Sequence, residues 1–415
     1  MPIAPEPCSA RGSRSIASSL YNASMTQSIY LDHNSTAPML PEVATAVREA
    51  SLRYGANPAS QHEPGRKARR VLEQARERIG ELLGARAGGR DADQLIFTSG
   101  GTEANNLALL GLLSAAAGAS RPGHLILSAI EHPSVAEAAR VLERSGWHVD
   151  RVGVDAHGVL CLDQLEQLLR PETRLVSLML GNNETGVLQP VARAVEICAA
   201  RGVPVHSDAV QVAGKLPVDF NGLRLALMSC AAHKFHGPMG VGALVVRRDI
   251  PLHPLLFGGH QQAGLRPGTE MVALAVGMQA ALECWQRESD ARRQRLTRLR
   301  DQLEQSLLDK FSTAVVIGRD APRLPNTSNI AFVGLDRQAL VMALDLAGVA
   351  CSTGSACASG SREPSPTLRA MGLPRDVLAG SIRLSLGATT TAAEIEEAVC
   401  RISRICQQLQ HGVNC

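Results

Sequence analysis

The stretch that decides the fold reads TSGGTEANN and covers Thr98–Asn106. It follows the short apolar run Leu95–Thr98 and precedes a helix-length apolar pattern. Two adjacent glycines, Gly100 and Gly101, let backbone N–H groups approach an anion at the start of a helix, and Thr102 can add a hydroxyl. A plain strand-to-helix turn with a Ser or Thr cap explains the same letters, so this stretch needs support from the rest of the chain.

Outward from this turn, helix-length segments alternate with short apolar runs from about Pro41 to Ile250. The runs are mostly bounded by Gly, Pro, Asn or Asp, as strands are. They are Leu95–Thr98, Leu125–Ser128, Val176–Leu180, Val203–Ser207, Leu225–Cys230 and Gly242–Val246. The alternation predicts an α/β fold with a mostly parallel seven-stranded sheet sandwiched by helices. Ligands bind beyond the carboxyl ends of such strands, so the polar residues after each run are the functional candidates.

The chain has 415 residues, which is more than one hydrophobic core usually holds. A long charged helix pattern from Met271 to Lys310 predicts a bridge to a smaller α+β C-terminal domain with strands at Ser328–Val333 and Ser381–Ser385. We therefore expect a large domain over residues 44–290 and a small domain formed by residues 28–43 and 291–415. Residues 1–27 are rich in Ser, Ala, Arg and Pro and lack an apolar core, which predicts a disordered extension or an early start codon, with a transit peptide as the weaker alternative.

Composition narrows the classes of function. With 3% aromatic residues and a net charge of +3, the chain offers neither stacking platforms nor a field for nucleic acid. Its apolar stretches are too short or too interrupted for a bilayer. The ten cysteines show no paired C-x-x-C spacing, which is typical of a reducing compartment and of no resident metal site. The sequence thus favours a cytoplasmic protein without direct nucleic-acid or membrane partners.

An acid and a lysine occupy the ends of two predicted strands. Asp208 ends the run that begins at Val203, where a carboxylate can keep the ring nitrogen of a pyridine cofactor protonated. Lys234 follows the next run and is enclosed by Gly237 and Pro238, which suits a Schiff base better than a solvated surface position. A helix N-cap for the acid and a surface site for the lysine are the structural alternatives. Anion loop, acid and lysine together occur in the order that pyridoxal phosphate chemistry needs.

Further candidates follow other strand ends or lie in the second domain. His132 can stack on a ring and move protons, although lone histidines are more often structural. Asn183 can bond a ring hydroxyl or a carboxylate, or simply build a turn. Cys357 lies among small residues from Cys351 to Ser361, which predicts a mobile loop whose thiol can visit a site and leave it. Arg383 suits an amino acid carboxylate, with a structural ion pair as the alternative.

Taken together, these residues resemble the cysteine desulfurases of the class V aminotransferase superfamily, and the chain is similar to their NifS-like branch. The resemblance runs from about Tyr30 to the C-terminal helix. Its motifs are Tyr30–Asn34, Asn57–Ser60, Thr98–Asn106, Glu131-His132, Asn182–Glu184, the Asp208 strand, His233-Lys234 and Gly354–Cys357. It implies the fold type I architecture of pyridoxal phosphate enzymes.

The resemblance also implies a role for each matching residue. The cofactor contacts would be Gly101, Thr102, His132, Asn183, Asp208, Gln211, His233, Lys234 and Thr269. Lys234, His132 and Cys357 would be catalytic, with Cys357 taking the sulfur of L-cysteine as a persulfide and leaving alanine. Arg383, Asn34 and Asn183 would bind the substrate carboxylate. Thr269 would reach the phosphate site of a neighbouring subunit, which implies a homodimer.

The same resemblance implies partners for the sulfur. The length of the cysteine-bearing loop is similar to the branch that supplies iron-sulfur scaffold proteins, so such a scaffold or another sulfur acceptor is expected. A transient iron-sulfur contact through Cys357 is compatible with that role. Alternatives are a selenocysteine lyase, a class V aminotransferase, which would not need Cys357, or a non-catalytic scaffold with the same fold.

Two positions depart from the family pattern. Ala231 stands where the family usually has a serine two residues before the His-Lys pair, so one phosphate hydrogen bond worth about 1 kcal/mol is lost. Gln262-Ala263 replaces the usual Glu-Arg pair in the glycine-rich stretch from Gly258 to Gly264. We expect the first change to affect cofactor affinity and the second to affect dimer contacts.

Overall fold

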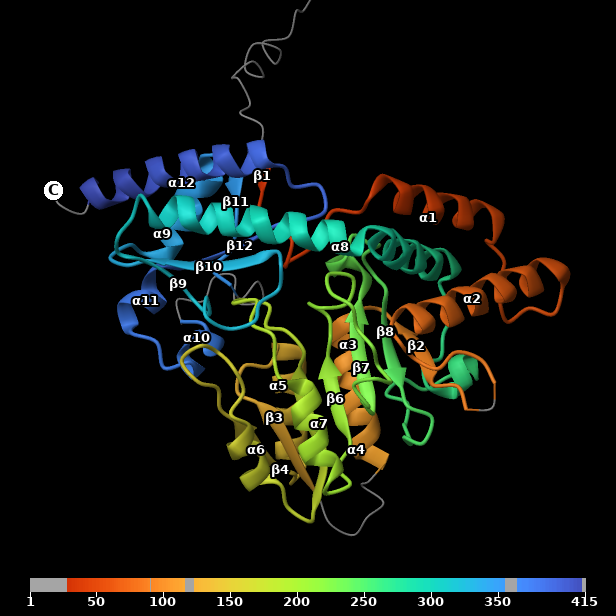
Figure 1. Cartoon of the computed structure of the whole chain (residues 1–415). Helices are drawn as coiled ribbons and strands as arrows, with labels where there is room; N and C mark the ends of the chain where they lie inside the picture. Colours follow the sequence, from red (N-terminus) through yellow and green to blue (C-terminus); the bar gives the residue numbers. More distant parts are fainter. Residues whose placement is uncertain (1–27, 90, 116–122, 355–363, 413–415) are drawn as a thin grey trace, which may run out of the picture.

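The computed structural model describes residues 28–89, 91–115, 123–354 and 364–412. Its largest feature is a seven-stranded sheet in which β8 runs antiparallel to both neighbours and all other neighbouring strands are parallel. The strands in spatial order are β2 (Gln94–Thr98), β8 (Gly242–Val246), β7 (Leu227–Ala231), β6 (Val205–Asp208), β5 (Thr173–Met179), β3 (His124–Ser128) and β4 (His148–Val152). The predicted mostly parallel seven-stranded sheet is confirmed (Figure 1).

Both faces of this sheet are buried, because successive side chains of each strand point to opposite sides. In β2, Leu95 and Phe97 enter one hydrophobic core while Ile96 enters the other. The first core is covered by α2 (Glu63–Leu82), α6 (Leu162–Leu168) and α7 (Val191–Ala199). The second is covered by α3 (Gly101–Asn106), the π-helical turn η2 (Leu107–Gly111), α4 (Leu112–Ala115) and α5 (Pro133–Arg144).

A smaller α+β part follows in the sequence. Its antiparallel sheet has the order β12 (Ser381–Ser385), β10 (Thr327–Phe332) and β9 (Ala314–Val316), and β1 (Ile29–Tyr30) pairs with β11 (Val349–Ala350). Its helices are α9 (Arg337–Leu346), α10 (Pro366–Ala370), α11 (Arg375–Gly380) and α12 (Ala392–Gly412). These elements build hydrophobic clusters separate from the cores of the large sheet.

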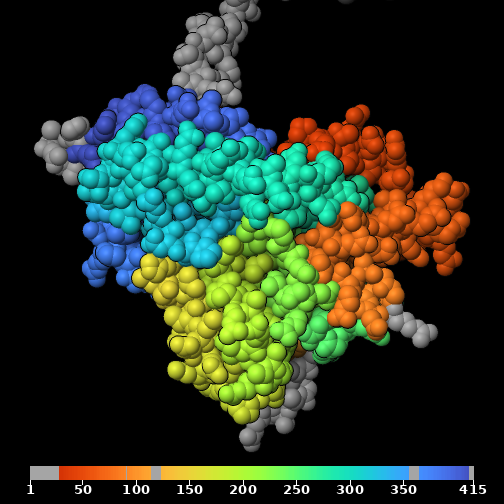
Figure 2. All heavy atoms as spheres, viewed as in Figure 1, coloured from red at the N-terminus to blue at the C-terminus, as the bar shows by residue number. Residues whose placement is uncertain are grey.

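One long helix, α8 (Val272–Leu308), belongs to both parts. Met278 and Leu282 lie in the first core of the large sheet, whereas Leu299 and Leu303 lie in the core of the smaller part. Figure 2 shows the green-to-cyan atoms of this segment across the upper part of the molecule, below the blue C-terminal atoms and beside the red atoms of α1 (Pro41–Arg53). The division of α8 between two hydrophobic cores supports our proposed large domain over 44–290 and small domain over 28–43 and 291–415.

The described helices include none with the combination of length and apolar character that a membrane span needs.

The two parts meet at the loop that follows β5. Val187 forms an isolated bridge with Arg323, and the backbone N–H of Leu188 donates to Pro322. Gly186 has φ of 79° and lies so close to Thr327 that a Cβ there would be 2.8 Å from the threonine Cβ. The close approach requires glycine and brings the carboxyl edge of the large sheet against the small part.

Candidate functional site

The predicted polar residues converge at the carboxyl edge of the large sheet. Asp208 ends β6 and is 6% exposed. Its Oδ2 accepts a 2.7 Å hydrogen bond from Asn105 Nδ2, and its Oδ1 accepts one of 2.9 Å from the backbone N–H of Val210. The Val210 bond is the turn-capping role expected of such an aspartate, and the Asn105 bond adds a second constraint. The carboxylate is therefore fixed in one orientation.

His132 is linked to the same group through Ser134. Its Nδ1 lies 2.8 Å from Ser134 Oγ, and that hydroxyl also accepts from Asn105 Nδ2 at 2.9 Å. The backbone N–H of Ser134 points at the same Nδ1 at 3.2 Å. Burial lowers the pKa of His132, Asp208 opposes this shift and Lys234 adds to it. Acid, imidazole and amine thus influence one another electrostatically.

Lys234 ends the short 3₁₀ turn η4 (Ala232–Lys234) after β7. Its Nζ donates to the backbone oxygens of Asn34 and Ser35 at 2.8 and 2.7 Å. The adjacent His233 bonds Thr36 Oγ1 at 3.1 Å, and burial, aided by nearby lysines, lowers its pKa to about 4. The amine is directed by backbone carbonyls of the N-terminal segment, not by bulk solvent.

The glycine turn before α3 approaches the sheet closely. A Cβ on Gly101 would lie 2.8 Å from Val210 Cγ2 and 3.5 Å from the Cβ of Ala231. Thr102 is exposed beside it. Ala231 is fully buried, so the residue that departs from the family serine faces the turn without a hydroxyl. Close packing explains why residue 101 is glycine. At residue 231, alanine lacks the hydroxyl that the family serine would supply.

The segment carrying Thr269 is linked to this turn within the same chain. Glu103 accepts from the backbone N–H of Ser99 at 2.6 Å and pairs with Arg266 at 2.9 Å. Thr269, three residues after that arginine, is exposed.

Arg383 is 1% exposed and lies where both parts of the molecule meet. Its Nη2 contacts Asp32 Oδ1 at 2.6 Å and Ser35 Oγ at 2.9 Å. Its Nη1 donates to the backbone oxygens of Asn183 and Gly354 at 3.1 and 2.8 Å. The structural ion pair raised as an alternative is therefore present. Only Nε lacks a hydrogen-bond partner among the described residues.

Asn182 and Asn183 have different roles in the site. Asn182 builds the turn, since its Oδ1 accepts from the backbone N–H groups of Glu184 and Thr185 at 2.9 Å each. The following Asn183 is half-buried and contributes its backbone oxygen to Asn34 and Arg383. Turn building was the structural alternative proposed for Asn183, but Asn182 builds this turn. The side chain of Asn183 therefore remains available for another role.

Lys215 was not among the residues predicted from the sequence, and it connects two that were, Asn34 and Gln211. Its Nζ donates to Asn34 Oδ1 at 2.9 Å and to Gln211 Oε1 at 2.7 Å, while Gln211 Nε2 donates to the backbone oxygen of Asn34 at 3.0 Å. Because a lysine ammonium only donates, it orients both amides with their oxygens toward it. Burial lowers the pKa of Lys215 well below its usual range, and Lys234 and Arg383 add to the shift. A lysine in the apolar stretch after Gln211 was the available signal.

Glu131 is a further ionisable group at the site that was not predicted from the sequence. Burial raises its pKa to about 8, and Asp208 adds to the shift while Ser128 and the backbone of Met179 oppose it. Its Oε1 accepts 2.7 Å hydrogen bonds from Ser128 Oγ and from the backbone N–H of Met179. The position directly before His132 was the signal for this group.

Cys357 lies outside the described residues. Among the described cysteines, burial raises the pKa of Cys198, Cys230, Cys351 and Cys406 to about 12. Thiols held this far from ionisation are poor nucleophiles at neutral pH. These four thiols are therefore better suited to packing than to nucleophilic chemistry.

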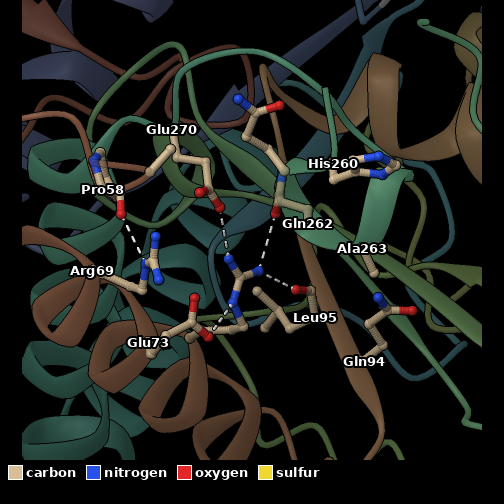
Figure 3. A pocket seen from close by; sticks show the side chains of 12 residues that line it. Pro58, Arg69, Glu73, Gln94, Leu95, His260, Gln262, Ala263 and Glu270 are labelled. Atoms are coloured by element: carbon tan, nitrogen blue, oxygen red, sulfur yellow. Dashed lines mark hydrogen bonds and ion pairs between the residues drawn. The ribbon is translucent and has the colours of Figure 1, made fainter. Parts of the chain in front are cut away.

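A cavity of about 490 Å³ lies away from these residues, between α2, β2 and the turn η5 (Gln261–Gly264) (Figure 3). The departure Gln262-Ala263 lines it. The Gln262 amide accepts from the backbone N–H of Phe97 at 2.7 Å and donates to its carbonyl at 2.8 Å. Gln262 thus covers the open edge of β2 in its own chain. We had expected this departure to affect contacts between subunits, and this contact within the chain was not predicted.

A second polar cluster lies at the opposite, amino end of the strands. His124 Nε2 and His148 Nε2 lie 3.2 and 3.3 Å from the carboxylate of Asp150. Arg170 already pairs with that carboxylate at 2.5 Å. Asp150 is thus neutralised by a guanidinium, and the cluster is remote from the site described above.

Comparison with known proteins adds independent information. The family model of the class-V aminotransferases matches residues 29–398. The chain is 41% identical over 382 residues to a cysteine desulfurase of Trichormus azollae, covering 92% of this chain and 94% of the relative. It is 39% identical to the cysteine desulfurase IscS of Dictyoglomus turgidum, over 93% of this chain and 96% of the relative. A solved NifS-like protein aligns with a TM-score of 0.84 at 32% identity, over 92% of this chain and all of that chain.

Proposed function

The chain belongs to the class-V aminotransferase family and is a cysteine desulfurase, and we propose that Lys234, Asp208 and Cys357 carry its reaction with pyridoxal phosphate. The observation that carries this proposal is the convergence of a fixed carboxylate, an amine and an imidazole at one sheet edge. The reaction is inferred from the names of the relatives. The roles of the residues are proposed from their arrangement at the sheet edge.

The residues present fit pyridoxal phosphate. Asp208 keeps a fixed carboxylate at the edge of the sheet, and Asn105 Oδ1 beside it is buried without a hydrogen-bond partner among the described residues. Gly101 leaves out the side chain that would crowd the turn before α3. When bound, pyridoxal phosphate supplies an electron sink for the α-carbon of an amino acid. Lys234, Asp208, Gln211, His132, Asn183, His233, Gly101 and Thr102 would hold it.

Asp208 and His132 are prepared for opposite proton roles. Two hydrogen bonds fix the Asp208 carboxylate as an acceptor for a protonated ring nitrogen. Since the backbone N–H of Ser134 can only donate, His132 Nδ1 is an acceptor and the neutral ring carries its proton on Nε2. Burial lowers the pKa of His132 and so favours the neutral ring, whose Nε2–H can donate a hydrogen bond while Nδ1 accepts from Ser134.

We propose that Arg383 binds the carboxylate of L-cysteine, with Asn34 and Asn183 beside it. The guanidinium is buried and anchored on Asp32, which fixes its plane. A planar fork pairs with a carboxylate better than a point charge does. Asp32 and the incoming substrate would share the charge of one arginine, and Lys215 orients the neighbouring Asn34 amide through a 2.9 Å hydrogen bond.

Cys357 is the proposed sulfur acceptor. The overall transfer balances without an external redox agent: the C–S bond of cysteine breaks, an S–S bond forms on Cys357, and the carbon gains the hydrogen that makes alanine. The sulfur is oxidised to the persulfide level while the carbon is reduced. The buried thiols at about pKa 12 are unsuited to this step, which leaves a thiol outside the core as the carrier.

Partners and location follow from the same function. We propose a homodimer in which Thr269 reaches the neighbouring subunit's phosphate site, supported by the exposure of this threonine. The persulfide would pass to an iron-sulfur scaffold or another sulfur-acceptor protein, in the cytoplasm.

Two substitutions test the proposal. Cys357→Ser should retain the visible absorbance of the bound cofactor and lose sulfide release from L-cysteine, because the hydroxyl cannot accept sulfur. Lys234→Ala should lose both the native absorbance and turnover, because no other amine replaces it. The assay measures alanine and sulfide together. An active Cys357→Ser enzyme would show that another thiol carries the sulfur, and an exchanged amino group without sulfide would indicate an aminotransferase.

A further inference from the structure

One amine to which the proposed mechanism gives no role of its own, that of Lys215, lies among the residues of the site. Lys215 follows Gln211 by four residues in the turns after β6. Its Nζ donates to Gln211 Oε1 at 2.7 Å and to Asn34 Oδ1 at 2.9 Å. Asn34 lies in the N-terminal segment before α1, so one amine joins two segments that are far apart in the sequence.

The position of Lys215 depends on the glycine before it. Gly214 has φ of 70°, and a Cβ there would collide with the side chain of Phe235, which directly follows Lys234. Both conformation and space therefore require glycine at this position. The close contact brings the two lysines together, and both line a small cavity of about 20 Å³.

The hydrogen bonds leave the Gln211 amide one orientation. Its Oε1 accepts from Lys215, and its Nε2 donates to the backbone oxygen of Asn34 at 3.0 Å. A flipped amide would lose both bonds, because a backbone oxygen only accepts. An amine donates to two oxygens with or without its extra proton, so Lys215 fixes the amide in either state. Gln211 is 6% exposed, and the described residues accept only one of its two amide N–H groups.

The backbone oxygen of Asn34 also locates this amide relative to Lys234. That oxygen accepts from Gln211 Nε2 at 3.0 Å and from Lys234 Nζ at 2.8 Å. The side chain of Asn34 is itself fixed, since Oδ1 accepts from Asn326 at 3.1 Å and Nδ2 donates to Thr327 Oγ1 at 2.9 Å. The Gln211 amide is thus anchored beside the amine that would hold the cofactor.

We propose that Lys215 is a positioning residue that acts through Gln211: together with the Asn34 carbonyl, it fixes the amide so that the remaining N–H is presented to the bound cofactor. This inference rests on the proposed roles of Gln211 and Lys234. A residue that contacts a ligand binds it best when neighbouring hydrogen bonds hold its side chain in one orientation. Without Lys215, the buried Gln211 oxygen would lose its donor and the amide would be held at one end only.

A double-mutant cycle between Lys215 and Gln211 tests this proposal. Methionine at either position removes the polar group and keeps an unbranched side chain. The Kd of pyridoxal phosphate is measured from the visible absorbance of holoenzyme dialysed against graded concentrations of the cofactor. We expect Lys215→Met and Gln211→Met each to raise this Kd about tenfold. The double variant should weaken binding about as much as Gln211→Met alone, because Lys215 acts through Gln211.

Two further variants leave the cycle intact and separate its causes. Lys215→Arg keeps N–H donors for both oxygens and should stay within about threefold of the wild-type Kd. Gln211→Glu keeps the bond from Lys215 but has no N–H for a ligand, so it should weaken binding at least as much as Gln211→Met. Lys67→Met is the matched control, because it makes the same change at an exposed lysine that pairs with Glu63, and its Kd should equal that of the wild type.

Three results would overturn the proposal. They are a wild-type Kd in Lys215→Met, a wild-type Kd in Gln211→Glu, and single effects that multiply to about a hundredfold in the double variant. In the third case Lys215 would act independently of Gln211. If Lys234→Ala retains the native absorbance, the proposed function of Lys234 fails, whatever the Lys215 variants do.

Discussion

Two regions of the site are built in different ways. The strand-end region consists of Asp208, Lys234, His132 and the Gly100-Gly101 turn, each at the end of a strand of the large sheet or within four residues after it. The assembled region consists of Asn34, Asn183, Gly354 and Arg383, which come from four distant segments and meet between the two parts of the molecule. The sheet positions the first region, whereas packing between the two parts positions the second.

The difference shows which part of the fold fixes the positions of the side chains in each region. Strand ends of one parallel sheet have a common edge, so the sheet alone sets the relative positions of Asp208 and Lys234. In the assembled region, Arg383 reaches Asp32 and Gly354 across 351 and 29 positions of the chain. Such contacts hold only while both parts are packed together. Substitutions there should therefore change substrate binding more than cofactor binding.

The largest effect is expected from Arg383→Lys in the assembled region. Lysine keeps the charge but loses the planar fork that would bind the carboxylate while holding Asp32. We expect the KM for L-cysteine to rise about 10- to 100-fold, equivalent to about 1.4 to 2.8 kcal/mol, with cofactor absorbance retained. Steady-state kinetics and an absorbance spectrum of the holoenzyme measure both quantities.

The matched control is Arg323→Lys, which alters another buried arginine, whose guanidinium pairs with Glu304 of α8. It should lower stability without raising KM. If Arg383→Lys instead lowers the melting temperature and leaves KM unchanged, its ion pair with Asp32 is the whole of its role.

The two regions also differed in how far the sequence predicted them. Each strand-end residue lies in a contiguous motif next to an apolar run, and strands such as Gly242–Val246 and Ser381–Ser385 were predicted at their observed bounds. The β4 strand was missed because His148–Val152 mixes polar and apolar residues at the sheet's open edge, where one side lacks a neighbouring strand. Short apolar runs indicate central strands better than edge strands.

In the assembled region, Asn183 and Arg383 were candidates from their local sequence, whereas Asn34 could be named only through the family resemblance. Nothing near Asn34 in the sequence indicates that its side chain bonds Thr327 and accepts from Lys215. The role of Lys215 likewise depends on tertiary contacts, because it is an isolated charged residue in a buried stretch. Local patterns cannot report such contacts.

The next effect concerns acid stability of the strand-end region. His206 is fully buried two residues before Asp208, and it bonds Ser177 and Ser229 at 2.9 and 3.0 Å. Burial lowers its pKa to about 3 in the folded chain. The unfolded chain binds the proton near pH 6.5, so the stabilising contribution of His206 is complete above that pH and is lost as the pH falls toward 3. At pH 5 the loss is about 2 kcal/mol for such a histidine.

Thermal unfolding between pH 8 and pH 5 measures this contribution. We expect the melting temperature to fall on acidification, and a His206→Gln variant to show a shallower fall, while His157→Gln, at an exposed site, follows the wild type. Burial also lowers the pKa of His33 to about 3 and of His236 to about 4, so part of the slope should remain in the variant. A wild-type melting temperature independent of pH in this range would contradict the assignment.

The smallest effect should come from Gln262→Glu, which restores the family residue at the edge of the strand-end region. The Gln262 amide donates to the carbonyl of Phe97 and accepts from its N–H and from Arg76 Nη1, and β2 leads directly into the glycine turn. Glutamate keeps the two accepted bonds but cannot donate, so its carboxylate would face the Phe97 carbonyl without a proton between them.

The lost donor should cost about 1 kcal/mol, partly offset by a stronger pair with Arg76. In a chain of this size we expect the melting temperature to fall by about 1 to 3 °C with unchanged kinetics. Gln261→Glu is the matched control, because the Gln261 amide oxygen accepts from the backbone N–H of Gly268 at 3.3 Å and a carboxylate keeps that bond. If Gln262→Glu raises the melting temperature, charge pairing with Arg76 outweighs the amide contact. The edge of β2 would then be held by electrostatics, as the family's glutamate would hold it.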